Sequence, residues 1–343
     1  MKLVVLLAIL ITLLAMPAFA TEYTLTDLGR GAASAINDNG QITGFRYDSE
    51  SGKDIGFFWD TTIGFKYIGS SVGRAINNHG QVTGGAWVWE YGVGVTELSV
   101  PAGIGSVTGS AINNSMQVVG AGYNEGGNYD ALAWLSSDNC VNIGVWDNPH
   151  SWAYDINESG TVVGEFWPVP GKNHAFKWSQ SSGFVDLGDF GTLFASANGI
   201  NDLEQIVGGY RPNGLTHAFL WSATQGLLDM GTLIGDGYHS CAYRINNHGQ
   251  VVGGSMFEPG NPNLHAFIWS STEGMSELDV PGGCVISRAT DINNNGQIVG
   301  SFVDISGIEH ISLWTPVPEP SSLLALGAGI ASTLGLLKRR KIG

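Results

Sequence analysis

The middle of the chain consists of short segments in which bulky side chains alternate with small or polar ones. At residues 174–178, His174, Phe176 and Trp178 fall on one side of an extended strand. Ala175 and Lys177 fall on the other side. Sheets with rings on one face and alanines on the other pack well against each other. Because no 3.6-residue period runs through this part, the pattern predicts an all-β domain of short strands.

One phrase recurs seven times: Ile-Asn, two or three variable residues, then Gln, a β-branched pair and Gly. The copies start at Ile36, Ile76, Ile112, Ile156, Ile200, Ile245 and Ile292. Their spacing of 36 to 47 residues is typical of propeller blades and of helical repeats. Since the unit lacks helical periodicity, blades are favoured.

Each repeat contains four segments. The first ends in Ile-Asn and leads into a tight turn such as Asp38-Asn39-Gly40, whose residues accept the positive φ of a hairpin. The second is the Gln-Val-Val-Gly phrase, and a long variable loop follows it. The third is His-Ala-Phe-x-Trp, and the fourth resembles Gly183–Gly188. We predict a seven-bladed β-propeller of four-stranded blades over residues 21–316.

The two ends of the repeat region indicate how the ring closes. The seventh copy stops at Trp314 without a fourth segment, while residues 23–29 form a fourth segment without the first three. We predict that residues 23–29 complete the last blade, which would remove the free edges of an open stack.

The glycines of the repeat predict local backbone geometry, and a few copies depart from the repeat. A Gly closes every second segment and predicts a close backbone approach or a bulge there: Gly44, Gly84, Gly120, Gly164, Gly208, Gly253 and Gly300. Met116 and Glu204 replace the turn Gly, and Thr161 replaces the Gln.

The two chain ends differ from the repeats. Residues 1–20 combine Lys2, an apolar run and Ala18-Phe19-Ala20, a pattern that predicts a cleaved signal peptide; an uncleaved anchor helix is the alternative. Residues 317–343 contain Pro318-Glu319-Pro320, an apolar stretch at residues 323–337 and a basic cluster at residues 338–341. This order predicts a single hydrophobic helix with a cytoplasmic basic end, rather than a core helix.

The C-terminal pattern resembles the PEP-CTERM sorting signal of Gram-negative bacteria, with Pro318, Glu319 and Pro320 matching its motif. The resemblance implies an exosortase-like enzyme as a partner, and the signal peptide at residues 1–20 implies signal peptidase as another. It also implies a transient inner-membrane anchor and a final place on the cell surface or in an extracellular biofilm matrix.

The repeats resemble those of the HAF family of extracellular repeats. His174-Ala175-Phe176, the triplets that start at His217 and His265, and the Asp-Leu-Gly phrases carry the match over residues 23–314. This resemblance implies export and repetition but no defined activity.

Charge narrows the classes of partner. Five of the fifteen basic residues lie in the two end segments, whereas all thirty acids lie between residues 21 and 320, so the mature part has a net charge of −20. Such a surface argues against nucleic acid. Export places Cys140, Cys241 and Cys284 in an oxidising compartment, and their pairing stays open.

No pattern of catalytic residues stands out. The chain has no Gly-x-Ser-x-Gly elbow and no phosphate-binding loop. His174, His217, His265 and His310 share one repeat position, which favours a structural role over a metal site. The repeated Asn either bonds the following turn, which we favour, or lines a channel. We expect no enzyme activity, no metal and no cofactor.

Ligand binding is expected on one face of the propeller. Alternate connections of a blade emerge on opposite sides, so the tight turns share one face, the tight-turn face, and the variable loops share the other, the long-loop face. Function concentrates on variable loops. The candidate ligand-binding residues there are Tyr123, Trp146, Trp152, Trp167, Tyr210, Tyr238 and His239.

Rings beside carboxylates suit a glycan or extracellular polymer. The predicted function is therefore an exported surface- or matrix-associated binding protein. The alternatives are a structural or adhesive protein–protein module and an exported polysaccharide hydrolase or lyase.

Overall fold

The computed structural model describes residues 22–69, 71–144 and 150–317. The expected signal peptide, the Pro318–Pro320 motif, the hydrophobic helix after it and Trp146 lie outside the described residues. Residues Leu25–Trp314 form one compact unit, and the two chain ends belong to a second unit.

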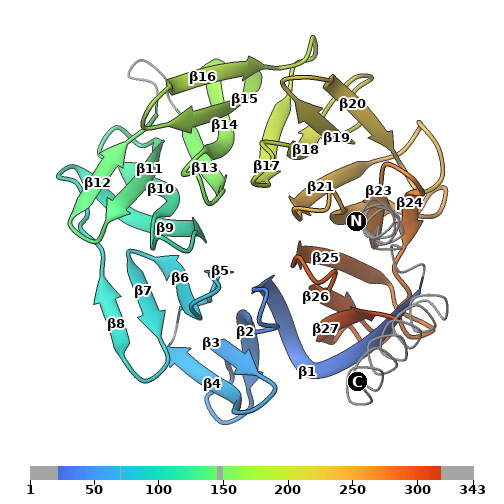
Figure 1. Ribbon diagram of the computed structural model, residues 1–343. Helices are drawn as coiled ribbons and strands as arrows, with labels where there is room; N and C mark the ends of the chain where they lie inside the picture. The colour runs from blue at the N-terminus through green and yellow to red at the C-terminus, as the bar shows by residue number, and fades with distance from the viewer. Residues whose placement is uncertain (1–21, 70, 145–149, 318–343) are drawn as a thin grey trace, which may run out of the picture. The chain divides into compact units, whose positions relative to one another are not determined.

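The unit Leu25–Trp314 is a seven-bladed β-propeller. Five four-stranded antiparallel sheets and one seven-stranded sheet are arranged in a ring, with the first strand of each blade innermost and the fourth at the rim (Figure 1). The seven-stranded sheet comprises two blades, because β1 (Tyr23–Ile36) is long enough to serve both. The predicted fold class and blade number are confirmed.

The strands of the first four blades follow chain order. Blade 1 contains the second half of β1, then β2 (Ile42–Asp48), β3 (Lys53–Asp60) and β4 (Gly64–Gly69). Blade 2 contains β5 (Ala75–Ile76), β6 (Gln81–Gly85), β7 (Trp87–Glu90) and β8 (Gly94–Glu97). Blade 3 contains β9 (Ile104–Ile112), β10 (Val118–Asn124), β11 (Tyr129–Ser136) and β12 (Asn139–Asn142). Blade 4 contains β13 (Ser151–Ile156), β14 (Val162–Val169), β15 (Lys172–Ser179) and β16 (Gly183–Gly188).

The last three blades have the same order. Blade 5 contains β17 (Ala195–Ile200), β18 (Ile206–Tyr210), β19 (His217–Ser222) and β20 (Gly226–Gly231). Blade 6 contains β21 (Ser240–Ile245), β22 (Val251–Met256), β23 (Leu264–Ser270) and β24 (Gly274–Glu277). Blade 7 contains β25 (Ile286–Ile292), β26 (Ile298–Val303), β27 (Glu309–Pro316) and the first half of β1.

The ring closes as the sequence predicts. β1 lies between β27 and β2 in the seven-stranded sheet, so the first strand of the chain is the fourth strand of the last blade. Leu28 packs against the cluster that contains Ile311 and Leu313. The chain runs from the long-loop face to the tight-turn face along every third strand and back along every fourth. Leu25 and Trp314 therefore both lie near the tight-turn face.

The core lies between the blades. Phe176 packs toward blade 3, in a cluster with Ala131 and Ala133. Ala175, its neighbour along β15, packs toward blade 5, in a cluster with Phe219. Each ring thus fills space left by the alanines of the adjacent sheet, as the alternating pattern predicts.

A closed ring of asparagine side chains joins all seven blades at the tight-turn face. The Nδ2 of each repeat Asn donates to the backbone carbonyl of the next repeat Asn, from Asn37 to Asn77 and so on until Asn293 returns to Asn37. The Oδ1 of Asn201 accepts the N–H groups of Leu203 and Gln205 in its own turn. The favoured interpretation, bonding to the following turn, is confirmed, and the bond to the next blade adds to it.

A second ring lies one residue further on. The side-chain oxygen of the residue after each repeat Asn accepts the backbone N–H of its counterpart in the preceding blade. The ring runs through Asp38, Asn78, Asn114, Glu158, Asp202, Asn247 and Asn294 and back to Asp38.

Glycine is required where the second strand passes the first. At Gly164, an added Cβ would overlap the backbone carbonyl oxygen of Trp152, and the same clash recurs at the other six glycines that close a second segment. Met116 and Glu204, which replace the turn Gly, keep its left-handed backbone with φ of 60° and 55°.

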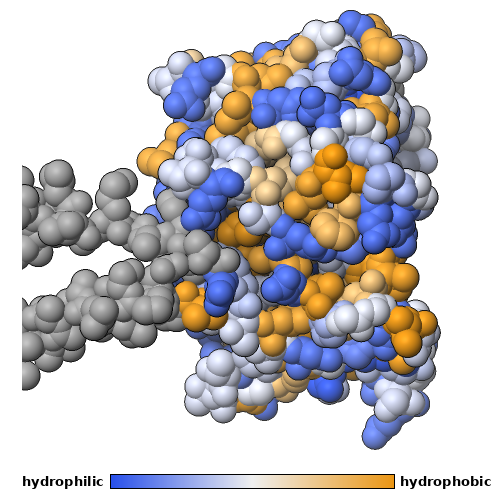
Figure 2. All heavy atoms as spheres, turned by 90° about the vertical axis from the view of Figure 1, so that its right-hand side faces the viewer, coloured by the Kyte–Doolittle hydropathy of each residue, from blue (hydrophilic) through white to orange (hydrophobic). Residues whose placement is uncertain are grey.

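The outer rim carries no single hydrophobic tract on the side that Figure 2 shows, where hydrophobic and hydrophilic residues are interspersed. Within the described ranges, no helix is long and apolar enough to span a bilayer.

Candidate functional site

Six rings from blades 3 and 4 meet on the long-loop face. We call them the aromatic cluster, and its members are Tyr123, Tyr129, His150, Trp152, Tyr154 and Trp167. The ring centroids of Tyr129 and Trp152 are 4.6 Å apart, and those of His150 and Trp167 are 4.5 Å apart. Tyr123 and Trp167 are 43% and 40% exposed, so the cluster offers flat apolar surface to solvent.

Strand register and backbone bonds hold these rings in place. Tyr123 and Tyr129 are paired across β10 and β11, which puts both rings on one face of the sheet. Trp152 donates its indole N–H to Ser110 of blade 3. The N–H of Trp167 donates to the carbonyl of His150, which fixes His150 against the end of β14.

The cluster leads into a pocket of about 700 Å³ on the same face. Tyr154 belongs to both, because its ring stacks on Trp152 and also lines the pocket. Blades 4, 5 and 6 supply the walls: Tyr154, Glu165, Phe194, Ser196, Asn198, Gly209, Thr216, His239, Ser240, Cys241, Met256, Pro262 and Leu264. Its size and mixture of apolar walls with few polar groups are those of small-molecule sites.

Two polar groups of the pocket are positioned by the fold. The Nδ1 of His239 accepts the N–H of Thr216 at 3.0 Å, so the neutral imidazole carries its proton on Nε2. Glu165 accepts a hydrogen bond from Asn173 at 2.9 Å. Burial, and then the nearby Glu165 carboxylate, raise the pKa of Tyr154, which keeps its hydroxyl protonated.

The structure brings some of the predicted residues together and separates others. Tyr123, Trp152 and Trp167 lie in the aromatic cluster, and His239 lines the pocket. Tyr210 is buried and donates its hydroxyl to Asp229 within blade 5. Tyr238 is half-buried beside His239 in the chain but is not among the pocket-lining residues.

Sequence reasoning missed Tyr129, His150 and Tyr154. The repeat register contains a signal for one of them, because His150 and His239 both lie six residues before the Ile of their blade. Both accept a backbone N–H from the preceding blade through Nδ1, His150 from Tyr129 and His239 from Thr216. The contact between the Tyr129 and Trp152 rings, whose planes are tilted by 38°, joins blades 3 and 4 and has no counterpart in the repeat pattern.

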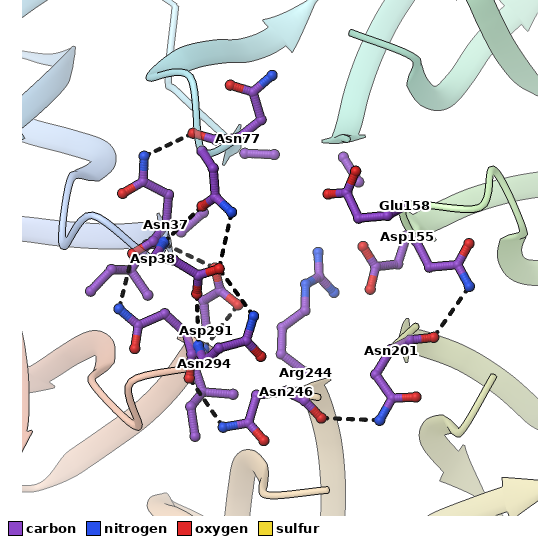
Figure 3. Close-up of a pocket in the computed structure, with 18 of the residues that line it drawn as sticks. Asn37, Asp38, Asn77, Asp155, Glu158, Asn201, Arg244, Asn246, Asp291 and Asn294 are labelled. Carbon is purple, nitrogen blue, oxygen red and sulfur yellow. Dashed lines mark hydrogen bonds between the residues drawn. The ribbon is translucent and has the colours of Figure 1, made fainter. Parts of the chain in front are cut away.

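A smaller polar hollow of about 180 Å³ lies among the innermost strands at the tight-turn face (Figure 3). Its wall includes the residue before the repeat Ile in six of the blades, which is Ala in blades 1 to 3 but Asp155, Arg244 and Asp291 in blades 4, 6 and 7. Figure 3 shows the Arg244 side chain extending between Asp155 and Asp291. Its Nη1 donates to the carbonyls of Asn198 and Tyr243.

Two of the acidic residues that line this hollow, Asp155 and Asp291, connect blades through their carboxylates. Asp291 accepts the N–H of Ile36 in blade 1, and Asp155 accepts the N–H of Ile200 in blade 5, each at 2.9 Å. Burial raises the pKa of Asp291 to about 6, and Arg244 opposes the rise. Burial also raises the pKa of Asp155. Arg244 thus supplies a counter-charge to Asp155 and Asp291, and the hydrogen bonds of these two carboxylates join blades.

The histidines of the third strand pair with acids of the fourth. His174 contacts Asp186, His217 contacts Asp229, and His265 contacts Glu277. Within the described ranges no group of three His, Cys, Asp or Glu side chains has the arrangement of a metal site.

The three cysteines are free thiols. Cys241 lies in the pocket wall, where burial raises its pKa to about 12. A thiol with this pKa is protonated at neutral pH and is a poor nucleophile.

Comparison with known protein families supports the sorting signal at the C-terminal end of the chain. Residues 316–341 match the PEP-CTERM protein-sorting motif, which implies export, processing by an exosortase and sorting to the cell surface. No curated protein matches the chain.

Solved structures support the fold. The chain is similar to the β-propeller domain of the Trilobed protease from Pyrococcus furiosus, with a TM-score of 0.57 and 10% identity over 83% of this chain and 95% of that chain. It is also similar to streptogramin B lyase (TM-score 0.54, 8% identity, 85% and 97% covered). Puromycin hydrolase gives a TM-score of 0.55 at 12% identity, with 84% of this chain and 53% of that chain covered.

Proposed function

We propose that this exported protein binds a glycan of the cell surface or extracellular matrix on its long-loop face, and that binding is its function rather than turnover. The observation that carries the proposal is the aromatic cluster, which leads into the 700 Å³ pocket. Flat rings supply large contact area at low conformational cost, and the adjoining polar groups orient a hydroxylated ligand.

The position of the chain ends supports this assignment. Leu25 and Trp314 lie near the tight-turn face, so attachment through either end of the propeller leaves the opposite face free. The HAF-like repeats and the sorting motif at residues 316–341 fit a surface location.

The number of carboxylates in the pocket favours binding over hydrolysis. Glu165 is the one carboxylate among the described lining residues, whereas most glycosidases use two carboxylates across the scissile bond.

A glycan array probed with the purified full-length chain tests the proposal. We expect binding to at least one polysaccharide, and Trp167→Ala should weaken it about tenfold, the equivalent of one lost stacking contact. Tyr67→Ala is the matched control, because Tyr67 is 57% exposed but lies in β4 at the rim. Absence of binding to every glycan by the folded protein would refute the proposal.

A further inference from the structure

The pocket beside the aromatic cluster has features that point to the kind of sugar it accepts. Phe194, Met256, Pro262 and Leu264 give it apolar walls. Unsubstituted sugars carry hydroxyl groups around the edge of the ring, and burying these hydroxyls among such walls without partners costs free energy. The apolar walls therefore fit a sugar that carries an apolar substituent.

The polar groups at the two sides of the pocket are complementary to an amide. His239 of blade 6 uses Nδ1 to hold Thr216, and its Nε2–H has no hydrogen-bond partner among the described residues. Glu165 of blade 4 accepts from Asn173 through Oε2 and also lines the pocket. One side can thus donate to a carbonyl oxygen, and the other can accept from an N–H.

We infer that the pocket holds the acetamido groups of an N-acetylated amino-sugar polymer whose sugar rings stack on the aromatic cluster. This inference rests on the proposed glycan-binding function. The acetyl methyl packs against Met256 and Leu264, and an acetamido carbonyl accepts from His239. Glu165 and the net negative charge of the domain disfavour acidic sugars.

Binding of the de-acetylated polymer tests the inference, because long-range attraction and the cost of desolvation then act in opposite directions. Loss of the acetyl group leaves an ammonium, which the acidic domain attracts at long range. Placing that ammonium among Phe194, Met256 and Leu264 requires its desolvation. Electrostatics alone would therefore favour the de-acetylated form, whereas the pocket favours the acetylated one.

The experiment is calorimetric titration of the full-length protein with the tetramer of N-acetylglucosamine and with the tetramer of glucosamine, at 150 mM salt. We expect the acetylated tetramer to bind at least tenfold more tightly. Equal or tighter binding of the glucosamine tetramer would overturn the inference while leaving glycan binding intact. If neither tetramer nor any glycan of the array binds, the proposed function itself fails.

Two variants test whether the preference for the acetylated tetramer arises in the pocket. Met256→Trp places a bulky ring in the cavity and should remove the preference for the acetylated tetramer. His239→Asn retains an acceptor for the Thr216 N–H but lacks Nε2–H, and should reduce the preference several-fold. Circular dichroism checks the fold of both, and Tyr67→Ala should keep the full preference. An unchanged preference in folded His239→Asn and Met256→Trp would reject this pocket as the acetamido site.

Discussion

His310 Nδ1 lies 2.9 Å from Asp27 Oδ2, although 283 positions separate the two residues in the chain. The same pair occurs within blades at a separation of 12 residues, as between His174 and Asp186. In both cases the acid also accepts the N–H of the Gly two residues later, Gly29 or Gly188. The first strand therefore completes the last blade with the same contacts that blades 4 and 5 use.

Closure without a covalent turn predicts a local weakness. In blade 4 a short turn connects β15 to β16, whereas no peptide link joins β27 to the first half of β1. We expect Asp27→Ala to accelerate amide hydrogen exchange in residues 23–29 and 309–316 by tenfold or more, because opening there requires no global unfolding. Hydrogen-exchange mass spectrometry measures this effect.

Asp186→Ala is the matched control, since Asp186 and Asp27 are 46% and 43% exposed. Exchange in β15 and β16 should change little in that variant. Equal acceleration in the two variants would show that the closing blade is no weaker than an internal one.

The sequence predicted the closure and the packing between blades because both follow from repetition. The last repeat lacks its fourth segment, and residues 23–29 form a fourth segment that belongs to no other repeat. Pairing the two completes the last blade. The alternation of Phe176 with Ala175 defines the two faces of a strand. The bond from each repeat Asn to the next blade was not predictable, because it depends on the distance between blades and not on any local pattern.

The buried asparagine ring should contribute strongly to stability. Asn201 is 3% exposed, accepts two N–H groups of its own turn and donates to the carbonyl of Asn246. We expect Asn201→Ala to lower the free energy of unfolding by about 2–4 kcal/mol, because several buried groups lose their partners. Urea denaturation gives the value.

Two further variants separate the roles of Asn201. Asn201→Asp keeps the acceptor for the turn but loses the donor to blade 6, so it should remain destabilised. Asn295→Ala removes a similar bond to the carbonyl of Asp38 at an exposed position and should cost less than about 0.5 kcal/mol. A cost of that size for Asn201→Ala would contradict the structural role of the ring.

The turn of blade 5 contains a strained residue. Glu204 has φ of 55°, a conformation that costs a residue with a Cβ about 1–2 kcal/mol. We expect Glu204→Gly to be more stable than Glu204→Ala by about 1 kcal/mol, since both lose the contact with Lys177 and only Gly relieves the strain. Thermal or urea unfolding of the two variants gives the difference.

The adjacent Leu203 provides a control of opposite sign. It is 67% exposed and does not have a positive φ, so Leu203→Gly should be less stable than Leu203→Ala. The same sign at both positions would mean that backbone strain does not set the stability of this turn.

The candidate site was less predictable than the fold. Long loops indicated the correct kind of surface for Tyr123, Trp152 and Trp167, but the approach of Tyr129 to Trp152 joins separate blades and requires three-dimensional placement. Tyr210 has the same composition signal as these rings, yet its hydroxyl is used by Asp229 in its own blade. Composition of a loop does not reveal which way a ring points.

The buried carboxylate of Asp291 should make stability depend on pH. Its pKa rises from 3.8 to about 6 on folding, mainly through burial. Between these values the folded protein holds a proton that the unfolded chain has released, so this contribution to stability is full below pH 4 and is lost as the pH rises through 6. The loss corresponds to about 3 kcal/mol. Asp291→Asn keeps an oxygen for the Ile36 N–H but does not titrate, so we expect it to gain on the wild type by up to that amount between pH 4 and 7 in urea denaturation.

Asp229 provides a control in which the change of stability with pH should have the opposite sign. Burial pushes its pKa up, but hydrogen bonds from His217 and Gly231 lower it below the ordinary value. Its contribution is therefore present above the unfolded pKa and is lost as the pH falls through the folded one. Asp229→Asn should accordingly lose stability relative to the wild type as the pH rises from 3 to 5, the reverse of Asp291→Asn.

One result would contradict the prediction for Asp291. If the difference in unfolding free energy between Asp291→Asn and the wild type does not change between pH 4 and 7, Arg244 offsets the burial of Asp291 completely, and the hollow contributes no pH dependence through this residue.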